Sequence, residues 1–259
     1  MRLLLSAVIW EKYLRSGMCQ IELVPLADKY GCAGIEFRPF WRSALAELPE
    51  IKGFIAEYGL VAAYSCSEAL CGPDPDEIRT SLQAMVNSIV MAEFLGAPVL
   101  KINVANRPFA PEITQEDWWT RAVLEVLGIA ASKGVVLAAE NAREGPGSDP
   151  EFLCRLAEHF GAAGLKLAFD TGNWARAGRD PSAAMEKLFP YISYVHLKDV
   201  AARSVNAPTV MPGAGVADVA GIMRRLIAKG YDGMFATVFP GGSSPALAVR
   251  AGLKYLRGE

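Results

Sequence analysis

Short apolar runs alternate with longer amphipathic segments along the whole chain. Several runs, such as VVLAA at 135–139, are apolar throughout rather than at every second position. Such strands are expected where both faces of a sheet are covered, as in a parallel sheet flanked by helices. The pattern predicts eight strands, at residues 3–9, 34–37, 60–66, 98–104, 135–140, 165–169, 191–197 and 234–239.

The segments between these runs carry helix start and stop signals. An Asp or Ser followed by proline predicts a helix start, because the side chain caps the first turn and the missing proline N–H costs nothing there. These pairs lie at 74–75, 149–150, 180–181 and 244–245. Thr114 and Asp117 form a weaker cap of the capping-box kind. Glycines that would end helices in left-handed backbone are Gly59, Gly96, Gly134, Gly164 and Gly230.

The repeated strand and helix units define the expected fold class. Eight units in 259 residues favour a closed barrel over an open doubly wound sheet, since a (β/α)8 barrel takes about 250 residues. No G-x-G-x-x-G follows the first run, and no Pro- or Ser-rich linker divides the chain. We expect an α/β fold, a single (β/α)8 TIM barrel spanning residues 1–259 as one domain.

Composition narrows the class of partner and the compartment. A hydrophobic fraction of 52% indicates a sizeable core, and a net charge of −2 gives no basic surface for nucleic acid. No apolar stretch approaches the roughly 20 residues of a membrane span, and we expect the apolar start at 1–10 to be the first strand. Five cysteines without a C-x-x-C pair indicate a reducing compartment, so a cytoplasmic protein is expected.

In such a barrel the active site lies at the carboxyl ends of the strands. Three consecutive predicted strands lead directly into a side chain that binds metals: VVLAAEN into Glu140, LKLAFD into Asp170 and ISYVH into His196. Each alone has an ordinary explanation as a turn cap or a core histidine. Together, two carboxylates and one imidazole form a mixed oxygen and nitrogen site that suits one divalent metal, namely Mn²⁺, Co²⁺, Mg²⁺ or Zn²⁺.

Several of these segments also resemble a known family. The chain is similar to the sugar phosphate isomerase/epimerase family of xylose-isomerase-like TIM barrels in GIEFRP, AAENA, FDTGNWARAGRDP, YISYVHLKD and the approach to the last strand, GYDG. The resemblance implies one divalent metal held by Glu, Asp, His and a second Glu. Its first three ligands fall on Glu140, Asp170 and His196. At the fourth position the chain has Val238, and at a site where many relatives have His it has Asn173.

The resemblance implies proton removal next to a carbonyl through an enediolate, with Glu140 as the catalytic base and the metal as Lewis acid. Because Val238 replaces the second glutamate, single-base isomerisation or elimination is favoured over two-base epimerisation of a sugar, sugar phosphate or keto-polyol. Glu36 or Glu68 is the alternative second base. A lyase or dehydratase, or a non-catalytic metabolite-binding barrel, remains the alternative function. A nuclease on this scaffold is disfavoured, because its metal cluster needs more than two histidines.

Polar and aromatic residues at other strand ends are candidates for binding a small sugar-like substrate. They are Trp10, Glu36, Arg38, Tyr64, Glu68, Asn103, Arg143, Asn173 and Lys198. Gly241, Gly242 and Ser243 precede a predicted helix start and form a candidate anion site. The long segment 200–214 is a candidate lid over the site. A homo-oligomer is compatible with the sequence, which does not fix the oligomeric state.

Overall fold

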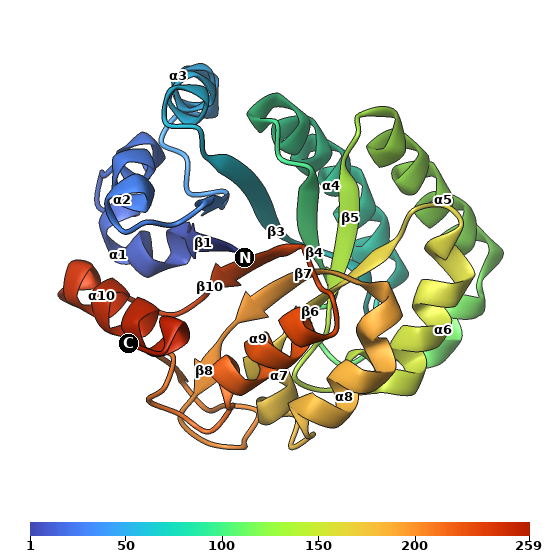
Figure 1. Cartoon of the computed structure of the whole chain (residues 1–259). Helices are drawn as coiled ribbons and strands as arrows, with labels where there is room; N and C mark the ends of the chain where they lie inside the picture. Colours follow the sequence, from blue (N-terminus) through green and yellow to red (C-terminus); the bar gives the residue numbers. More distant parts are fainter.

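The eight predicted strands form one closed parallel barrel surrounded by helices (Figure 1). The computed structural model describes residues 1–259. The barrel strands follow the order β1, β10, β7, β6, β5, β4, β3 and β2, so the first and last strands pair and close it. They are β1 (Arg2–Ser6), β2 (Gly34–Phe37), β3 (Val61–Cys71), β4 (Val99–Ala105), β5 (Val136–Glu140), β6 (Lys166–Asp170), β7 (Ile192–Leu197) and β10 (Met234–Thr237). The prediction of a (β/α)8 TIM barrel is confirmed.

Helices connect the strands on the outside of the barrel (Figure 1). They are α1 (Glu11–Leu14), α2 (Leu23–Lys29), α3 (Ala44–Glu57), α4 (Pro75–Leu95), α5 (Asp117–Ser132), α6 (Pro150–Gly161), α7 (Thr171–Arg176), α8 (Pro181–Leu188), α9 (Val219–Ala228) and α10 (Pro245–Arg257). Short 3-10 helices lie at Ala7–Trp10, Gln20–Glu22, Pro111–Gln115, Pro146–Ser148 and Phe189–Tyr191. No helix has the length and apolar character needed to cross a membrane.

The predicted helix ends are largely confirmed. The side chains of Asp74, Asp149 and Asp180 each accept the N–H two residues further on, whereas Ser244 makes no such bond although α10 begins at Pro245. The expected Thr114 cap is wrong, because its hydroxyl donates to the Pro111 carbonyl and α5 begins after Glu116. All five glycines predicted to end helices have φ between 62° and 100°.

Two apolar clusters show which side of each strand faces the barrel axis. Nine residues form the interior cluster: Leu4, Ala63, Val99, Ala138, Ala168, Tyr194, Met234, Ala236 and Val238. A separate cluster of 68 buried residues fills the space between strands and helices. Because side chains alternate along a strand, residues two positions beyond the interior ones also face inward. Glu140 follows Ala138 and Asp170 follows Ala168 in this way. Both carboxylates therefore lie inside the barrel, at the end formed by the carboxyl ends of the strands.

Two strand boundaries differ from the prediction by three residues or more. β1 ends at Ser6, and the predicted remainder of this run forms the 3-10 helix Ala7–Trp10. β3 continues to Cys71, with an irregularity in its pairing with β4 between Ser65 and Ala69. A bulge of this kind bends a strand and re-aims the side chains around it.

The long segment after β7 is ordered by one buried carboxylate. It contains a small antiparallel pair, β8 (Asp199–Val200) and β9 (Thr209–Val210). Asp199 is 1% exposed, and its oxygens accept backbone N–H groups from Val200, Gly213, Gly215 and Ala217 at 2.9–3.0 Å. Four such bonds satisfy the buried charge and fix the segment beside the end of β7. Pro208 and Thr209 thereby reach the wall of a cavity that also contains His196.

We predict that Asp199→Ala loosens this segment selectively. Removal of the carboxylate leaves buried N–H groups unpaired, which costs about 2–4 kcal/mol of unfolding free energy. Amide hydrogen exchange at Gly213, Gly215 and Ala217 should accelerate strongly, while exchange in β5 and β6 follows only the global loss. Asp28→Ala is the matched control, since Asp28 is exposed and its removal should leave both measurements unchanged. Equal protection of these three amides in wild type and Asp199→Ala would contradict the conclusion that Asp199 holds the segment after β7 in place.

Candidate active site

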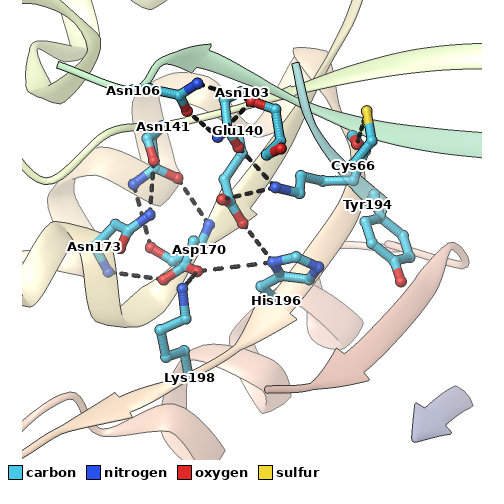
Figure 2. A network of polar contacts seen from close by, with 12 residues as sticks. Cys66, Asn103, Asn106, Glu140, Asn141, Asp170, Asn173, Tyr194, His196 and Lys198 are labelled. Carbon is cyan, nitrogen blue, oxygen red and sulfur yellow. Dashed lines mark hydrogen bonds and ion pairs between the residues drawn. The ribbon is translucent and has the colours of Figure 1, made fainter. Parts of the chain in front are cut away.

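Three neighbouring strands bring Glu140, Asp170 and His196 together at the mouth of the barrel. Glu140 ends β5, Asp170 ends β6, and Asp170 is the register partner of His196 on β7. Each residue offers one ligand atom within 4.8 Å of the others, and all three are buried. Figure 2 shows the three side chains pointing toward one another. The structure thus places together the three residues that the sequence singled out.

The facing atoms of these three residues are left without hydrogen bonds. Glu140 Oε1, Asp170 Oδ2 and His196 Nδ1 are all buried and have no hydrogen-bond partner, although Lys198 forms an ion pair with Asp170 Oδ2. His196 Nδ1 nevertheless lies against Glu140 Oε1 and 3.7 Å from Asp170 Oδ2. A lone pair that faces two carboxylates is repulsive unless a cation lies among them. The donor set therefore fits a divalent metal, which prefers these oxygen and nitrogen ligands.

A proton is the alternative cation at this point. Burial alone would lower the pKa of His196, but the Glu36 and Glu140 carboxylates outweigh it and raise this pKa to about 10. The metal-free imidazole is therefore protonated at neutral pH, and a metal ion that binds Nδ1 displaces that proton.

Glu36 lies behind His196 and holds its other ring nitrogen. Its Oε2 contacts His196 Nε2 and accepts the Tyr194 hydroxyl at 2.9 Å. Its Oε1 accepts the Ser6 hydroxyl at 2.6 Å and the Arg38 guanidinium at 2.9 Å. Burial would raise the pKa of Glu36, but Arg38 and His196 hold it well below its usual range. A carboxylate on the far nitrogen is the usual device that orients a metal-binding histidine.

Two lysines pair with the two carboxylates of the triad. Lys101, from β4, lies 3.3 Å from Glu140 Oε2 and donates to Asn103 Oδ1 at 2.7 Å. Lys198 lies against Asp170 Oδ2 (Figure 2). Burial would raise the pKa of Glu140, but Lys101 first and His196 second hold it well below its usual value, so this carboxylate is ionised.

The D-T-G-N segment after β6 builds the surroundings of Asp170. The Thr171 hydroxyl donates to the Lys198 carbonyl at 2.6 Å and accepts the Lys198 N–H at 3.0 Å, which ties β6 to β7. A Cβ atom on Gly172 would lie 2.8 Å from Lys198 Cγ, so glycine makes room for the lysine stem. The Asn173 N–H donates to Asp170 Oδ1 at 2.7 Å, and its amide reaches the Asn141 carbonyl. Each residue of the motif thus has a distinct physical role.

Three cavities at the barrel mouth share Glu140 as a wall residue. The largest, about 790 Å³, also contains His196, Lys198 and Val238. One of about 390 Å³ lies toward Cys66 and Lys101, and one of about 170 Å³ lies toward Asn141 and Asn173. Val238 is buried and belongs to the barrel-interior cluster. The largest cavity therefore has an apolar side chain where the family resemblance led us to expect a carboxylate.

The predicted substrate-binding residues divide into two groups. Those on cavity walls are Arg38, Asn103, Arg143, Asn173, Lys198, Gly241 and Gly242. The Gly241 N–H donates to the Ile9 carbonyl at 3.0 Å and is not free for a ligand. Those that line none of the three cavities are Trp10, Glu36, Tyr64, Glu68 and Ser243.

The second group lies elsewhere for identifiable reasons. Tyr64 follows the inward-facing Ala63, so it faces the helices, where it stacks on Trp41. Trp10 is buried in the outer core. Glu68 lies in the irregular part of β3, beyond the point where the prediction ended that strand.

Lys101 and Asn141 are site residues to which the sequence analysis gave no role. Asn141 accepts the Asp170 N–H at 2.8 Å through its side-chain oxygen. Lys101 follows the inward-facing Val99 by two positions and therefore also faces inward. Because a lysine is rarely buried in an apolar strand, the alternation of side chains could have identified Lys101 as a site residue from the sequence.

Comparison with known proteins defines the family. A family model described as the xylose isomerase-like TIM barrel matches residues 24–259. The chain belongs to this family, which confirms the resemblance seen in its motifs.

Curated relatives and solved structures add detail. The chain is 28% identical over 167 residues to a 2-epi-5-epi-valiolone 7-phosphate 2-epimerase of Actinoplanes sp., covering 62% of this chain and 58% of that protein. It is also 28% identical over 155 residues to an inosose dehydratase of Bacillus thuringiensis, covering 53% and 51%. The chain thus spans between half and three fifths of these relatives' length. A probable 3-DHS dehydratase from Bacillus anthracis superposes with a TM-score of 0.80 at 14% identity, covering 99% of each chain, and shows the shared fold.

We predict that Gly172→Ala displaces Lys198 from Asp170. The new methyl group would overlap the lysine stem, so the free energy of unfolding should fall by about 1–3 kcal/mol. Gly128→Ala is the matched control, because nothing lies within 4 Å of a Cβ at this helical glycine; it should stabilise by about 0.5–1 kcal/mol. Chemical denaturation measures both effects. If Gly172→Ala were as stable as Gly128→Ala, the proposal that Gly172 makes room for the Lys198 side chain would be refuted.

Proposed function

We propose that this barrel is a divalent-metal-dependent enzyme of the isomerase/epimerase type, acting on a sugar, sugar phosphate or related keto-polyol. One observation supports the proposal above all others: three buried ligand atoms, one each from Glu140, Asp170 and His196, face one another at the barrel mouth without hydrogen-bond partners, and only the Asp170 oxygen has a cation, Lys198, beside it. The relatives' names, a 2-epi-5-epi-valiolone 7-phosphate 2-epimerase and an inosose dehydratase, support an enzyme that acts on a sugar-like substrate.

Glu140, Asp170 and His196 would hold the metal. When bound, the metal supplies Lewis-acid polarisation of a substrate carbonyl, which makes the neighbouring C–H more acidic. Glu36 keeps the His196 ring oriented through Nε2, so that Nδ1 faces the two carboxylates. Mn²⁺, Co²⁺, Mg²⁺ and Zn²⁺ all accept this donor set.

Glu140 is the proposed base. Its carboxylate is ionised, because Lys101 and His196 hold its pKa below the usual value, and it forms part of the wall of all three cavities. A positioned carboxylate that removes a proton contributes about 10²–10⁴-fold to the rate. Lys101 restrains one carboxylate oxygen and fixes the side chain in place.

One-base chemistry is favoured over two-base epimerisation. Val238 offers no proton-transferring group in the largest cavity. Glu36 has both oxygens engaged behind His196 and is 0% exposed, and Glu68 lines none of the cavities. Neither alternative second base is thus supported by its position. In isomerisation, Glu140 would remove the proton and return it to the neighbouring carbon. In elimination, as the names of the dehydratase relatives imply for those proteins, Glu140 would remove the proton and return it to the departing hydroxyl group, which leaves as water.

Solvent deuterium exchange tests this proposal without knowledge of the product. The chelator-treated protein is incubated in D₂O with ketoses, ketose phosphates and keto-inositols, with and without added Mn²⁺, and incorporation next to the carbonyl is followed by NMR. We expect exchange only with metal, and a loss of about 10²–10⁴-fold in Glu140→Gln. About one metal ion per chain should bind to the wild-type protein, and Asp170→Asn should bind much less than one ion per chain.

Glu186→Gln is the control, because Glu186 pairs with Lys229 on the outer surface and should exchange like wild type. Exchange without added metal would refute the proposed metal dependence. Full exchange in Glu140→Gln would refute Glu140 as the base. A protein that binds metal and a polyol without any exchange would be the non-catalytic barrel instead.

A further inference from the structure

The largest cavity has cationic walls although the chain as a whole is slightly acidic. Lys12, Arg15, Arg38 and Lys198 line it, against the two carboxylates of Glu11 and Glu140. The whole chain carries 26 Lys and Arg against 28 Asp and Glu. The positive charge is therefore gathered at the proposed site, where walls of low dielectric constant strengthen its field.

Two buried ion pairs are oriented with their cations toward this cavity. Arg38 and Lys198 have side chains that are 18% and 13% exposed, and both line the cavity. Their partners, Glu36 and Asp170, are 0% exposed and lie behind them. A ligand in the cavity therefore meets the cationic ends first, and the compensating carboxylates act from a greater distance.

The two arginines also keep unused donors. Arg38 bonds Glu36 Oε1 through Nε and Nη2, and Arg15 bonds Glu11 Oε1 through the same two atoms. The Nη1 group of each makes no hydrogen bond within the protein, and Lys12 has no ion-pair partner. Guanidinium groups held along one edge are preorganised to bind a carboxylate or phosphate with the rest of the fork.

The smallest of the three cavities has a different character. Its walls include Asn103, Asn106, Asn141 and Asn173, and side-chain amides are groups that can both donate to and accept from sugar hydroxyls. Its arginines are neutralised at the surface or used internally. Arg107 pairs with the exposed Glu77, Arg143 lies near Glu144, and Arg176 donates to Ala207 and Thr209.

We propose that the substrate is a hydroxylated carbonyl compound with an anionic group, a carboxylate or a phosphate, that binds against Arg38 and Lys198 in the largest cavity. Arg15 and Lys12 attract this group at the rim, and the hydroxylated part of the molecule extends past Glu140 toward the amides. Val238 adds no negative charge to this wall, so an anion meets no repulsion there. This inference rests on the proposed function only in placing the substrate at the same site.

Calorimetric titration with a matched set of ligands tests the substrate class. The probes are D-fructose, D-fructose 6-phosphate and 2-keto-D-gluconate, which compare a neutral ketose with its phosphate and with a ketose-like carboxylate. We expect at least one anionic probe to bind about tenfold or more tightly than D-fructose, with affinity falling as ionic strength rises. The tighter of the two anionic probes tells whether the site takes a phosphate or a carboxylate.

Rim variants keep the test independent of the buried pairs. Lys12→Gln/Arg15→Gln changes only exposed residues, so the protein should fold, and it should lose about fivefold or more in affinity for the anionic probe. Arg224→Gln/Lys254→Gln removes the same charge from exposed positions that line none of the three cavities and should bind like wild type.

Three results would overturn the inference. D-fructose could bind as tightly as both anionic probes, the rim variant could bind the anion as tightly as wild type, or neither anionic probe could bind at millimolar concentration. Because binding is measured without turnover, anion binding by a protein that catalyses no exchange would refute the proposed function alone. Metal-dependent exchange on neutral ketoses without anion preference would refute only this inference.

Discussion

The barrel mouth is governed by the cost of burying charge. Glu36, Glu140 and Asp170 lie below the surface of the site, where an unpaired carboxylate is strongly disfavoured. Each is matched by one cation, Arg38, Lys101 and Lys198 respectively. Glu140 Oε1 and His196 Nδ1, which face each other within the triad, have no hydrogen-bond partner. The whole site follows from this arrangement, because paired charges are fixed in place and the unpaired ones require a cation between them.

Much of the scaffold is predictable from local pattern. Eight apolar runs gave eight strands, and strand ends such as those of β5 and β6 delivered Glu140 and Asp170 to the axis. Alternation could have gone further, because Tyr64 stands next to the inward-facing Ala63 and must face the helices. The reach of β3 to Cys71 was not predictable, since the irregularity that extends it arises in its pairing with β4.

The partners within the site could not be predicted, because they depend on contacts between distant parts of the chain. Glu36 and His196 are 160 residues apart, and Lys101 and Glu140 are 39 apart. Only closure of the barrel reveals that Glu36 supports the histidine from behind. The sequence shows that Val238 replaces a carboxylate, but only the structure shows that Val238 shares a cavity with several cationic side chains. The cavity thus lacks one negative group and has an excess of positive ones, and both features favour an anionic substrate.

The most direct test of the account is the position of a bound metal. Crystals soaked in MnCl₂ and measured at the manganese absorption edge should show one anomalous peak bounded by Glu140, Asp170 and His196, with Lys198 still beside Asp170. Absence of such a peak at saturating Mn²⁺, with the Lys198 ammonium or a protonated His196 bridging the two carboxylates instead, would contradict the central claim that this triad is a metal site.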